Sequence, residues 1–451
     1  RNDGLQEFSG LLINEVCSSA KKSVKDAAGE SPDWIEIYNS SDKAMDISGI
    51  GLSDGAKKKF KFAFPEGTII PADGYILVYC DDAVNEAEGE YHAAFKLSAD
   101  GESVYMTHPD YGEIDFVKVP LLDEDVTWGR FANGSDNFTY LSYTPGKTND
   151  TAEDLTPVEM PVFSAEGGFY DDAFGLTLSD AFGSEIIYTT DGSDPRTSDT
   201  AKPYDGEIKI YNNTSDPNVY SAITDINLSG YKAPKTSVDK GIIVRAVCKT
   251  AEGKFSDVAT NSYFVGKNAD YYTDFKVVSL STDSDYLFDK DNGFYMVGKN
   301  YHDLVSSGKF ILRDANDASN PTNYNIDGKE SEFPANVQVF EEGKLVYTND
   351  VGARLSGNWS RGFAQKSIRL YARSEYGDSK LKYEFIEELT DINGDPIKEF
   401  DKVTLRNGGT DNQLLHFRDL LIQSLCTDRA MAVQAGEPCI VFIDEIDAIG
   451  K

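Results

Sequence analysis

The chain has 451 residues, which suggests about three domains at roughly 100 to 200 residues each. Lys and Arg number 43 against 76 Asp and Glu, so the net charge is −33, which disfavours binding to nucleic acid or to an anionic membrane surface. Aromatic residues at 12% and hydrophobic residues at 40% exclude the composition of a disordered chain.

The sequence contains no apolar run close to the roughly 18 residues that cross a bilayer, so we expect no membrane span. The opening residues Arg1 to Gly4 lack the layout of a signal peptide, and we expect the chain to begin after a removed leader. The cysteines lie far apart without CxxC spacing, which indicates buried thiols rather than a zinc site or a disulfide framework. They are Cys17, Cys80, Cys248, Cys426 and Cys439.

Residues 1–150 are predicted to form an all-β, immunoglobulin-like sandwich. Short apolar or alternating runs, typical of strands, are separated by turn signals such as Ser53-Asp54-Gly55. In the alternating run Trp34 to Tyr38, Ile35 and Ile37 are expected on one face. The predicted strands include 11–16, 34–38 and 75–79.

This segment resembles a bacterial lamin-tail domain. The likeness rests on Ile13-Asn14-Glu15-Val16, Asp33 to Asn39, Asp46-Ile47-Ser48-Gly49, Thr127-Trp128-Gly129-Arg130 and Thr144 to Asn149, in that order. The resemblance implies an immunoglobulin-like module used for attachment or interaction, without a catalytic role.

Two other features of this segment have simpler interpretations. Pro145-Gly146-Lys147-Thr148 lacks the earlier glycine of a phosphate-binding P-loop, because Leu141 stands at that position. The basic run Lys57 to Lys61 is typical of a strand edge kept soluble by lysines, and contact with a polyanion is the alternative.

Residues 151–159 are polar and predict a linker, and residues 160–267 predict a second all-β sandwich. Its predicted strands include 186–190, 242–247 and 261–265. The phrase Tyr188 to Pro195 and the run Ile243 to Val247 resemble the chitobiase/hexosaminidase C-terminal type of sandwich. That resemblance implies a spacer or a contact with carbohydrate. The insertion 211–240 departs from the compact pattern of that family.

The turn acids of this second module, Asp191 and Asp194, have two interpretations. Asp-Gly and Asp-Pro steps favour hairpin formation, and a role in binding calcium or sugar is the alternative.

Residues 268–443 change to a mixed α and β pattern. Runs at 275–280, 337–340 and 366–371 predict strands. Thr410 and Gln413 form a capping-box signature, and apolar residues at helical spacing then predict an amphipathic helix over 411–427.

This third segment resembles the front part of a CotH kinase domain. The likeness rests on Val278-Ser279-Leu280, Asn292 to Tyr295, Arg354 to Leu370, Leu405 to Gly409 and Phe417-Arg418-Asp419. The family is a remote relative of protein kinases, and the resemblance implies ATP and Mg²⁺ or Mn²⁺ as cofactors and Ser or Thr of exported proteins as acceptors.

Four cations of this segment are the candidate cofactor-binding residues: Arg354, Arg361, Lys366 and Arg369. Phosphate binding needs glycines for close backbone approach, Lys as a point charge and Arg as a bidentate donor, and Gly357 and Gly362 stand among these cations. By family position Lys366 is the first choice for the phosphates. The alternative is that the cations only pair with the carboxylates of an acidic protein.

No metal site is predicted from the residues themselves. The Asp residues between 283 and 291 miss the spacing of a calcium loop and indicate a turn instead. The four histidines, His92, His108, His302 and His416, have no spacing that suits a catalytic triad or zinc.

The C-terminus departs from the CotH pattern. The family continues after Asp444 with a Gly-Glu-aromatic-Trp-Gly motif and then its catalytic residues, which we expect beyond Lys451. Residues 438–450 instead resemble the Walker B strand of AAA-type ATPases, without any GxxxxGK[ST] motif in the chain. We interpret 444–451 as an anomalous tail from truncation, fusion or assembly.

The sequence therefore predicts a multidomain chain: two all-β immunoglobulin-like sandwiches followed by an incomplete α+β domain of atypical-kinase type. Two functions are compatible with it. The first is a secreted or cell-surface bacterial protein kinase of CotH type that acts on an exported substrate. The alternative is a non-catalytic interaction or carbohydrate-associated adaptor at the cell surface or in a matrix.

Overall fold

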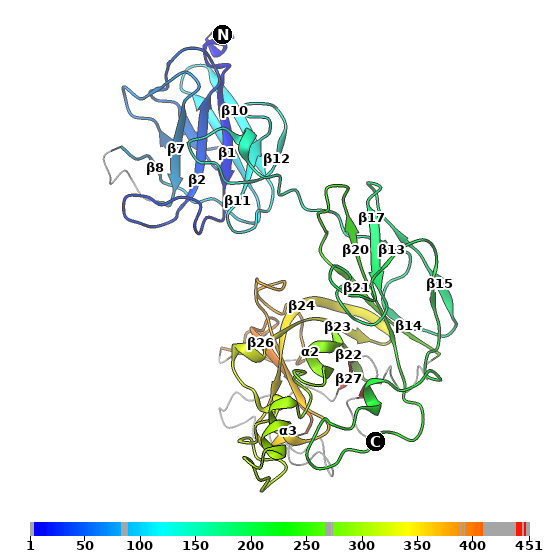
Figure 1. Cartoon of the computed structure of the whole chain (residues 1–451). Helices are drawn as coiled ribbons and strands as arrows, with labels where there is room; N and C mark the ends of the chain where they lie inside the picture. Colours follow the sequence, from blue (N-terminus) through cyan, green and yellow to red (C-terminus); the bar gives the residue numbers. More distant parts are fainter. Residues whose placement is uncertain are drawn as a thin grey trace. The chain divides into compact units, whose positions relative to one another are not determined.

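The computed structural model describes residues 4–82, 89–266, 272, 274–387, 389–391, 393–408, 439–443 and 446–447, the last two ranges by their backbone alone. The chain divides into two compact units, Arg1–Pro157 and Val158–Lys451. The boundary falls inside the segment predicted as a linker. Strands dominate the described part of both units, and the helices there are short (Figure 1).

The first unit is a β-sandwich. One sheet has the strand order β12-β11-β1-β2-β7-β8, the other has the order β10-β9-β4-β5, and β3 pairs with β6. Strands β1, β2 and β7 lie side by side in Figure 1. The elements are η1 (Leu5–Phe8), β1 (Leu11–Cys17), β2 (Asp33–Asn39), β3 (Met45–Asp46), β4 (Gly51–Ser53), β5 (Phe62–Ala63), β6 (Ile69–Ile70), β7 (Tyr75–Cys80), β8 (His92–Ala93), β9 (Glu102–His108), β10 (Gly112–Val119), β11 (Val126–Arg130), β12 (Phe138–Ser142) and η2 (Asn149–Thr151).

The core of this unit lies between its two sheets. Ile35 and Ile37 share one face of β2 and pack with Val104 and Met106 of the other sheet, as the alternation predicts. The opposite face of β2 is also buried, because Trp34 packs with Cys17, Ala20 and Tyr79 in a second cluster. Covered on both faces, β2 can hold polar side chains only where they find hydrogen-bond partners.

One sheet runs through the second unit in the order β18-β17-β20-β21-β14-β24-β23-β22-β27-β28, with β25 paired to β24 and β26 to β25. The sandwich elements are β13 (Val162–Phe163), β14 (Gly168–Tyr170), β15 (Phe174–Leu176), β16 (Leu178–Ser179), β17 (Glu185–Thr189), β18 (Lys202–Pro203), β19 (Ile208–Ile210), η3 (Tyr220–Ala222), β20 (Ile242–Lys249) and β21 (Ala259–Val265).

The remaining elements of this unit come from the third segment. They are β22 (Lys276–Ser281), α2 (Ser284–Phe288), α3 (Lys299–Ser306), η4 (Asn323–Asn325), η5 (Lys329–Ser331), β23 (Phe333–Glu341), β24 (Lys344–Ser356), η6 (Trp359–Gly362), β25 (Ser367–Tyr371), β26 (Lys402–Leu405), β27 (Cys439–Ile443) and β28 (Ile446–Asp447). The helix predicted over 411–427 lies outside the described residues, as do positions 444, 445 and 448–451 of the tail.

Strand β14 joins the second sandwich to the third segment, although the sequence predicts two separate domains here. It pairs with β21 in parallel and with β24 in antiparallel orientation. A small shared core of Phe264, Tyr272, Val277 and Phe340 lies at this junction. The two segments therefore form one continuous structure.

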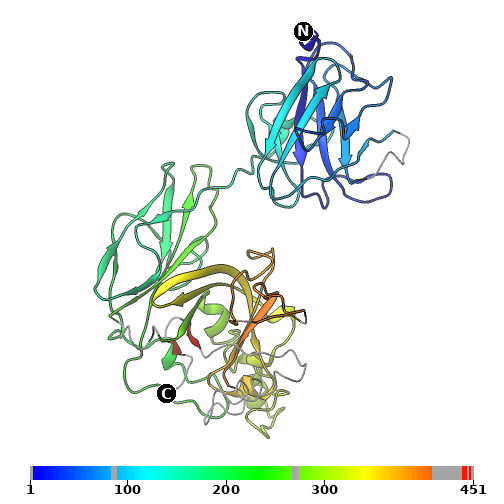
Figure 2. The same cartoon turned by 180° about the vertical axis from the view of Figure 1, so that it is seen from behind.

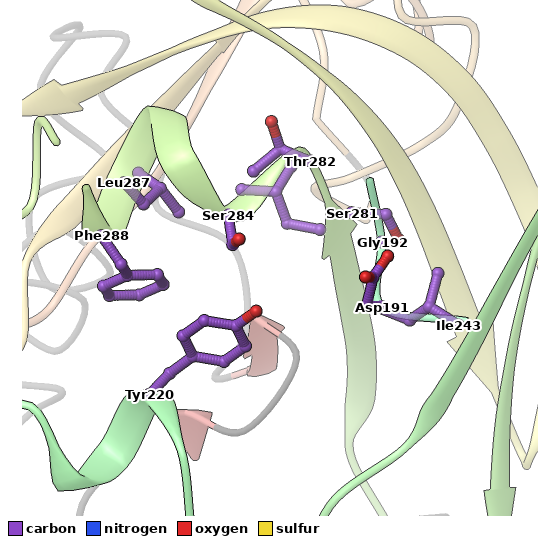
Figure 3. Close-up of a pocket in the computed structure, with 10 residues that line it drawn as sticks. Asp191, Gly192, Tyr220, Ile243, Ser281, Thr282, Ser284, Leu287 and Phe288 are labelled. Carbon is purple, nitrogen blue, oxygen red and sulfur yellow. The ribbon is translucent and has the colours of Figure 1, made fainter. Parts of the chain in front are cut away.

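The insertion 211–240 of the sandwich packs on the third segment. Ile226 is buried in the core formed by β22 to β25, and the ring of Tyr220 stacks on Phe288 of α2 at 5.0 Å. Figure 3 shows Tyr220 and Phe288 facing each other beside a small cavity whose other walls include Asp191 and Ile243 of the sandwich. The insertion thus fastens the sandwich to the elements that carry the candidate site.

Strand β24 is the longest strand of the described part and connects the two ends of this unit. Its first residue pairs with β14, and its last residues pair with β25. In Figure 2 the long curved yellow strand runs toward the orange strand β26, and β25 lies between β24 and β26 in the sheet order. The end of β24, the turn η6 and the strands β25 and β26 together position the candidate site.

Candidate anion-binding site

Strands β24 and β25 bring two of the predicted cations together. Arg354 and Arg369 are directly opposite each other in the antiparallel register. Like charges in such a position repel, so the pair requires compensation by nearby acceptors or by an anion. Arg361 joins them from η6, in the connection between the two strands.

A cavity of about 460 Å³ lies at this place. Among the described residues that line it, four guanidinium groups face the single carboxylate of Asp327. The lining residues are Asp327, Arg354, Leu355, Ser356, Gly357, Ser360, Arg361, Ser367, Arg369, Tyr371, Thr404, Arg406 and Asn407. We call this cavity the arginine pocket.

Arg354 is oriented by a buried carboxylate behind it. Its Nε and Nη2 donate to Oε2 of Glu332 at 2.8 and 2.6 Å, and its guanidinium lies 4.6 Å from the ring centroid of Tyr371. Burial acts to raise the pKa of Glu332, but the hydrogen bonds and charges of Arg354 and Arg373 outweigh it and lower that pKa. Glu332 is therefore ionised at neutral pH and holds Arg354 in place.

Arg361 is held by backbone and carboxylate acceptors on one side. Its Nη1 donates to the carbonyls of Asn325 and Ile326 at 3.3 and 3.4 Å, and its Nη2 donates to Asp327 at 3.1 Å. Its Nε is buried and has no hydrogen-bond partner among the described residues. A buried donor without an acceptor is unfavourable.

The remaining arginines of the pocket come from β25 and from the end of β26. Nε of Arg369 donates to the hydroxyl of Thr404 at 2.9 Å. Arg406 follows β26 and lines the same cavity. Strands β25 and β26 are neighbours in the sheet. On each strand, side chains two positions apart point to the same face, so alternate residues of both strands line the pocket.

Lys366 does not line the pocket, although the family position makes it the first choice for the phosphates. Its side chain is buried, and its Nζ lies 4.0 Å from the ring centroid of Tyr324 and 5.1 Å from that of Tyr295. Nζ donates to the carbonyls of Arg361 and Phe363 at 2.6 and 2.9 Å. Burial holds the pKa of Lys366 well below its ordinary value.

The other polar candidates of the sequence lie in turns. Asp191 accepts from the backbone of Ser193 at 3.1 Å, and Asp194 accepts from the guanidinium of Arg196 at 2.6 Å. Asp283 caps α2 by accepting from the backbone of Asp285. In the part of the chain that the structure describes, no group of three or more His, Cys, Asp or Glu side chains is arranged to hold a metal ion.

The cysteines whose side chains the structure describes fit the interpretation as buried thiols, and the side chains of Cys426 and Cys439 lie outside the described residues. Cys17, Cys80 and Cys248 are buried free thiols. The basic run Lys57 to Lys61 lies in the connection between β4 and β5 and not on a strand edge. In the basic run, Lys61 pairs with Asp54, and Lys59 lies 3.9 Å from Glu113.

Sequence reasoning missed Glu332, Asp327, Thr404, Arg406 and Asn407 as parts of the site. Their positions depend on pairing between distant strands, which no local pattern displays. Alternation along β25 gave one usable signal. Lys366 stands three positions before Arg369, and side chains at this odd spacing fall on opposite faces of a strand. The face of Lys366 carries Ile368 and Leu370, which are buried in the core with Lys366 beside them.

Comparison with known protein families gives two matches, both in the sandwiches. Residues 6–120 match the family described as Lamin Tail Domain, and residues 175–263 match the family described as Fn3 associated. No curated protein matches the chain. Among the residues described, no helix is long and apolar enough to cross a membrane. The chain is thus similar to two β-sandwich families, and the arginine pocket lies outside both matched ranges.

Proposed function

We propose that the arginine pocket binds the phosphate groups of a nucleotide, and that the chain belongs to an exported phosphotransferase of the CotH kinase type. The single observation that carries the proposal is the convergence of Arg354, Arg361 and Arg369 on one cavity with Arg406. The first three are cations that the sequence pattern predicts as phosphate-binding residues. Their convergence depends on strand pairing that played no part in that prediction.

The electrostatics of the pocket support an anionic ligand. The protein as a whole carries a charge of −33, so four arginines around one cavity form a local exception. Guanidinium groups bind phosphate oxygens through paired N–H donors, and a recessed site strengthens such contacts by excluding water.

Trp359 supports a nucleotide rather than inorganic phosphate. It stands at the start of η6, next to the pocket residue Ser360, and 52% of its surface is exposed. An exposed indole beside a cationic site offers a stacking surface for a planar base.

The fit of the expected cofactors differs between ATP and the metal ion. The donors of the pocket suit the phosphates of ATP, which Arg354, Arg361, Arg369 and Arg406 would hold. The described lining offers only the carboxylate of Asp327 to Mg²⁺ or Mn²⁺, and these ions bind mainly through oxygen ligands. We therefore assign the metal no ligand set among the described residues and derive no chemical step through it.

On this proposal the two sandwiches attach or present the pocket at a bacterial cell surface or in a matrix. The resemblance of the second sandwich to the chitobiase/hexosaminidase C-terminal type supports carbohydrate as its contact. The acceptor of the phosphoryl group would be an exported protein.

Thermal unfolding of the full chain with ligands tests the proposal. Millimolar ATP with Mg²⁺ or Mn²⁺ is expected to raise the melting temperature, since a ligand at about 100 times its dissociation constant adds about 2.7 kcal/mol of stability. Pyrophosphate is expected to act in the same direction, and adenosine without phosphate is expected to have no effect.

Matched arginine variants assign the effect to the pocket. Arg369→Gln removes a pocket cation and is expected to reduce the shift, whereas Arg313→Gln changes an exposed arginine outside the pocket and should preserve it. Absence of a shift with every phosphate ligand, or an equal loss in both variants, would contradict the proposal.

A further inference from the structure

Lys366 lies beneath the turn that carries Arg361. Its Nζ donates to the carbonyls of Arg361 and Phe363, so both of its described hydrogen bonds end on the turn formed by residues 358–363. The rings of Tyr324 and Tyr295 lie on its other sides. An amine group whose N–H donors reach carbonyls and whose other sides face aromatic rings is satisfied without any anion.

The same turn supplies two residues to the arginine pocket, Ser360 and Arg361. Within the turn, the amide of Arg361 donates to the carbonyl of Asn358 at 3.1 Å, and the amide of Phe363 donates to that of Ser360 at 3.3 Å. These bonds give the turn one conformation but do not attach it to the rest of the unit. The attachment comes from side chains.

Lys366 and Asn407 supply part of that attachment, beside the guanidinium of Arg361, which donates to the carbonyls of Asn325 and Ile326 and to Asp327. Asn407 donates to the carbonyl of Gln365 at 2.6 Å, at the point where the connection enters β25. Lys366 holds the turn itself, through carbonyls on both sides of Gly362. Without its N–H donors, these carbonyls would lose a hydrogen-bond partner and the turn could move relative to β25.

We infer that Lys366 is a positioning residue for anion binding, whose Nζ group holds the turn 358–363 so that Arg361 faces the pocket. This inference rests on the proposed function of the pocket. It assigns phosphate contact to the arginines and removes Lys366 from the groups that touch the ligand.

Chemical labelling of the wild-type chain separates this role from direct contact. An amine-reactive reagent is applied to the native protein with and without pyrophosphate, and modification of Lys366 is measured by mass spectrometry. Lys366 is expected to stay unmodified in both samples, while the exposed Lys344 is modified in both. Modification of Lys366 in the free protein and protection by pyrophosphate would overturn the inference.

Substitution of Lys366 tests its effect on the turn. Lys366→Met keeps the length of the side chain and removes its donors, and we expect pyrophosphate affinity to fall at least about tenfold. Hydrogen exchange at the amides of Arg361 and Phe363 should accelerate in the same variant. Lys366→Gln retains two donors and should restore part of both properties, and Lys344→Met is the matched control.

The outcomes distinguish the inference from the function on which it rests. If the wild-type chain binds no phosphate ligand, the proposed function fails, while labelling and hydrogen exchange still decide whether Lys366 holds the turn. If the wild type binds and Lys366→Met binds equally well, the positioning role is wrong and the pocket assignment stands. If Lys366→Met does not fold, Lys366→Gln and the labelling of the wild type decide.

Discussion

The side-chain amide of Gln338 hydrogen-bonds to the backbone of Ser262 as a peptide group of a neighbouring strand would. Its Oε1 accepts from the amide of Ser262 at 2.9 Å, and its Nε2 donates to the carbonyl of Thr260 at 2.8 Å. These residues lie in β21, on the part of the strand that precedes its pairing with β14. Gln338 belongs to β23, so one fully buried side chain links the second sandwich to the third segment.

Replacing Gln338 with Leu should destabilise the second unit. The change leaves two buried backbone groups without partners, which we expect to cost about 2 to 4 kcal/mol. Hydrogen exchange of the full chain, followed in peptides from β21 and β23, measures the loss in both segments. Lys344→Leu, at an exposed position of β24, serves as the control and should change stability by less than about 0.5 kcal/mol. Faster exchange confined to β23 would show that the two segments unfold separately.

The insertion 211–240 should be needed for the stability of the third segment. Ile226→Ala creates a cavity in the core that contains Val278, Tyr295 and Val337, and we expect a loss of about 2 to 4 kcal/mol. Urea unfolding monitored by the fluorescence of Trp359 reports on this unit if Trp34 and Trp128 are replaced by Phe. Val219→Ala, in the same insertion at a position 58% exposed, is the matched control. An equal effect of both changes would show that the insertion is not packed as the structure places it.

The sequence predicted where the strands of this protein lie better than it predicted which segments pack against them. Alternation predicted the strand at 34–38 and a continuous apolar run predicted the one at 75–79, and the structure has β2 and β7 there, two residues and one residue longer. Glu36 illustrates what alternation cannot give. Glu36 stands between Ile35 and Ile37, so its side chain points to the other face of the strand, which is typically exposed to solvent. It is nevertheless fully buried, because loops far along the chain cover that face.

The candidate site shows the same division between local and distant information. Arg354, Arg361 and Arg369 were accessible to sequence reasoning because they lie within one short segment with two glycines. Glu332, which orients Arg354, and Arg406, which completes the pocket, precede and follow that segment and reach it only through the pairing of β23, β24, β25 and β26. Lys366, the first choice by family position, lies outside the pocket lining, and its alternation with Arg369 indicated the core face.

Glu332→Gln should loosen Arg354 and lower the stability of the second unit. The Glu332 side chain is 1% exposed and accepts from both Arg354 and Arg373, so loss of its charge should cost about 1 to 3 kcal/mol at pH 7. The pKa of Glu332 is lowered in the folded state, so its contribution is present above its unfolded pKa and is lost as the pH falls through its folded pKa. Wild type and variant should therefore become more similar in urea unfolding as the pH is lowered below about 4. Glu330→Gln, at the exposed neighbouring acid, should match the wild type throughout.

A second buried acid, Glu15 of β1, should give the first unit the opposite pH dependence. Its Oε1 accepts from the hydroxyl of Thr127 at 2.6 Å, and its Oε2 lies 3.0 Å from the hydroxyl of Thr144. The Thr144 hydroxyl also lies 3.0 Å from Oδ1 of Asn149, and one hydroxyl proton cannot serve both acceptors. A proton on Glu15 supplies the missing donor. Burial raises the pKa of Glu15 from 4.5 to about 7, against the hydrogen bonds of Thr127 and Thr144, which lower it.

Glu15→Gln should remove much of this pH dependence. In the wild type, the folded state keeps a proton that the unfolded state releases between pH 4.5 and about 7, so stability falls as the pH rises through that window. The loss of stability is on the order of 3 kcal/mol if Glu15 titrates alone, and nearby Glu36, whose pKa burial raises to about 8, extends the loss to higher pH.

Gln keeps the neutral form and can donate to the Thr144 hydroxyl, so the variant should equal or exceed the wild type in stability at pH 8 and have a flatter profile. Urea unfolding followed by Trp34 and Trp128 fluorescence between pH 4.5 and 8 measures this, with Glu66→Gln as the exposed control. A variant that is less stable than the wild type at pH 8 would mean that Glu15 is ionised in the folded protein and is stabilised by its hydrogen bonds.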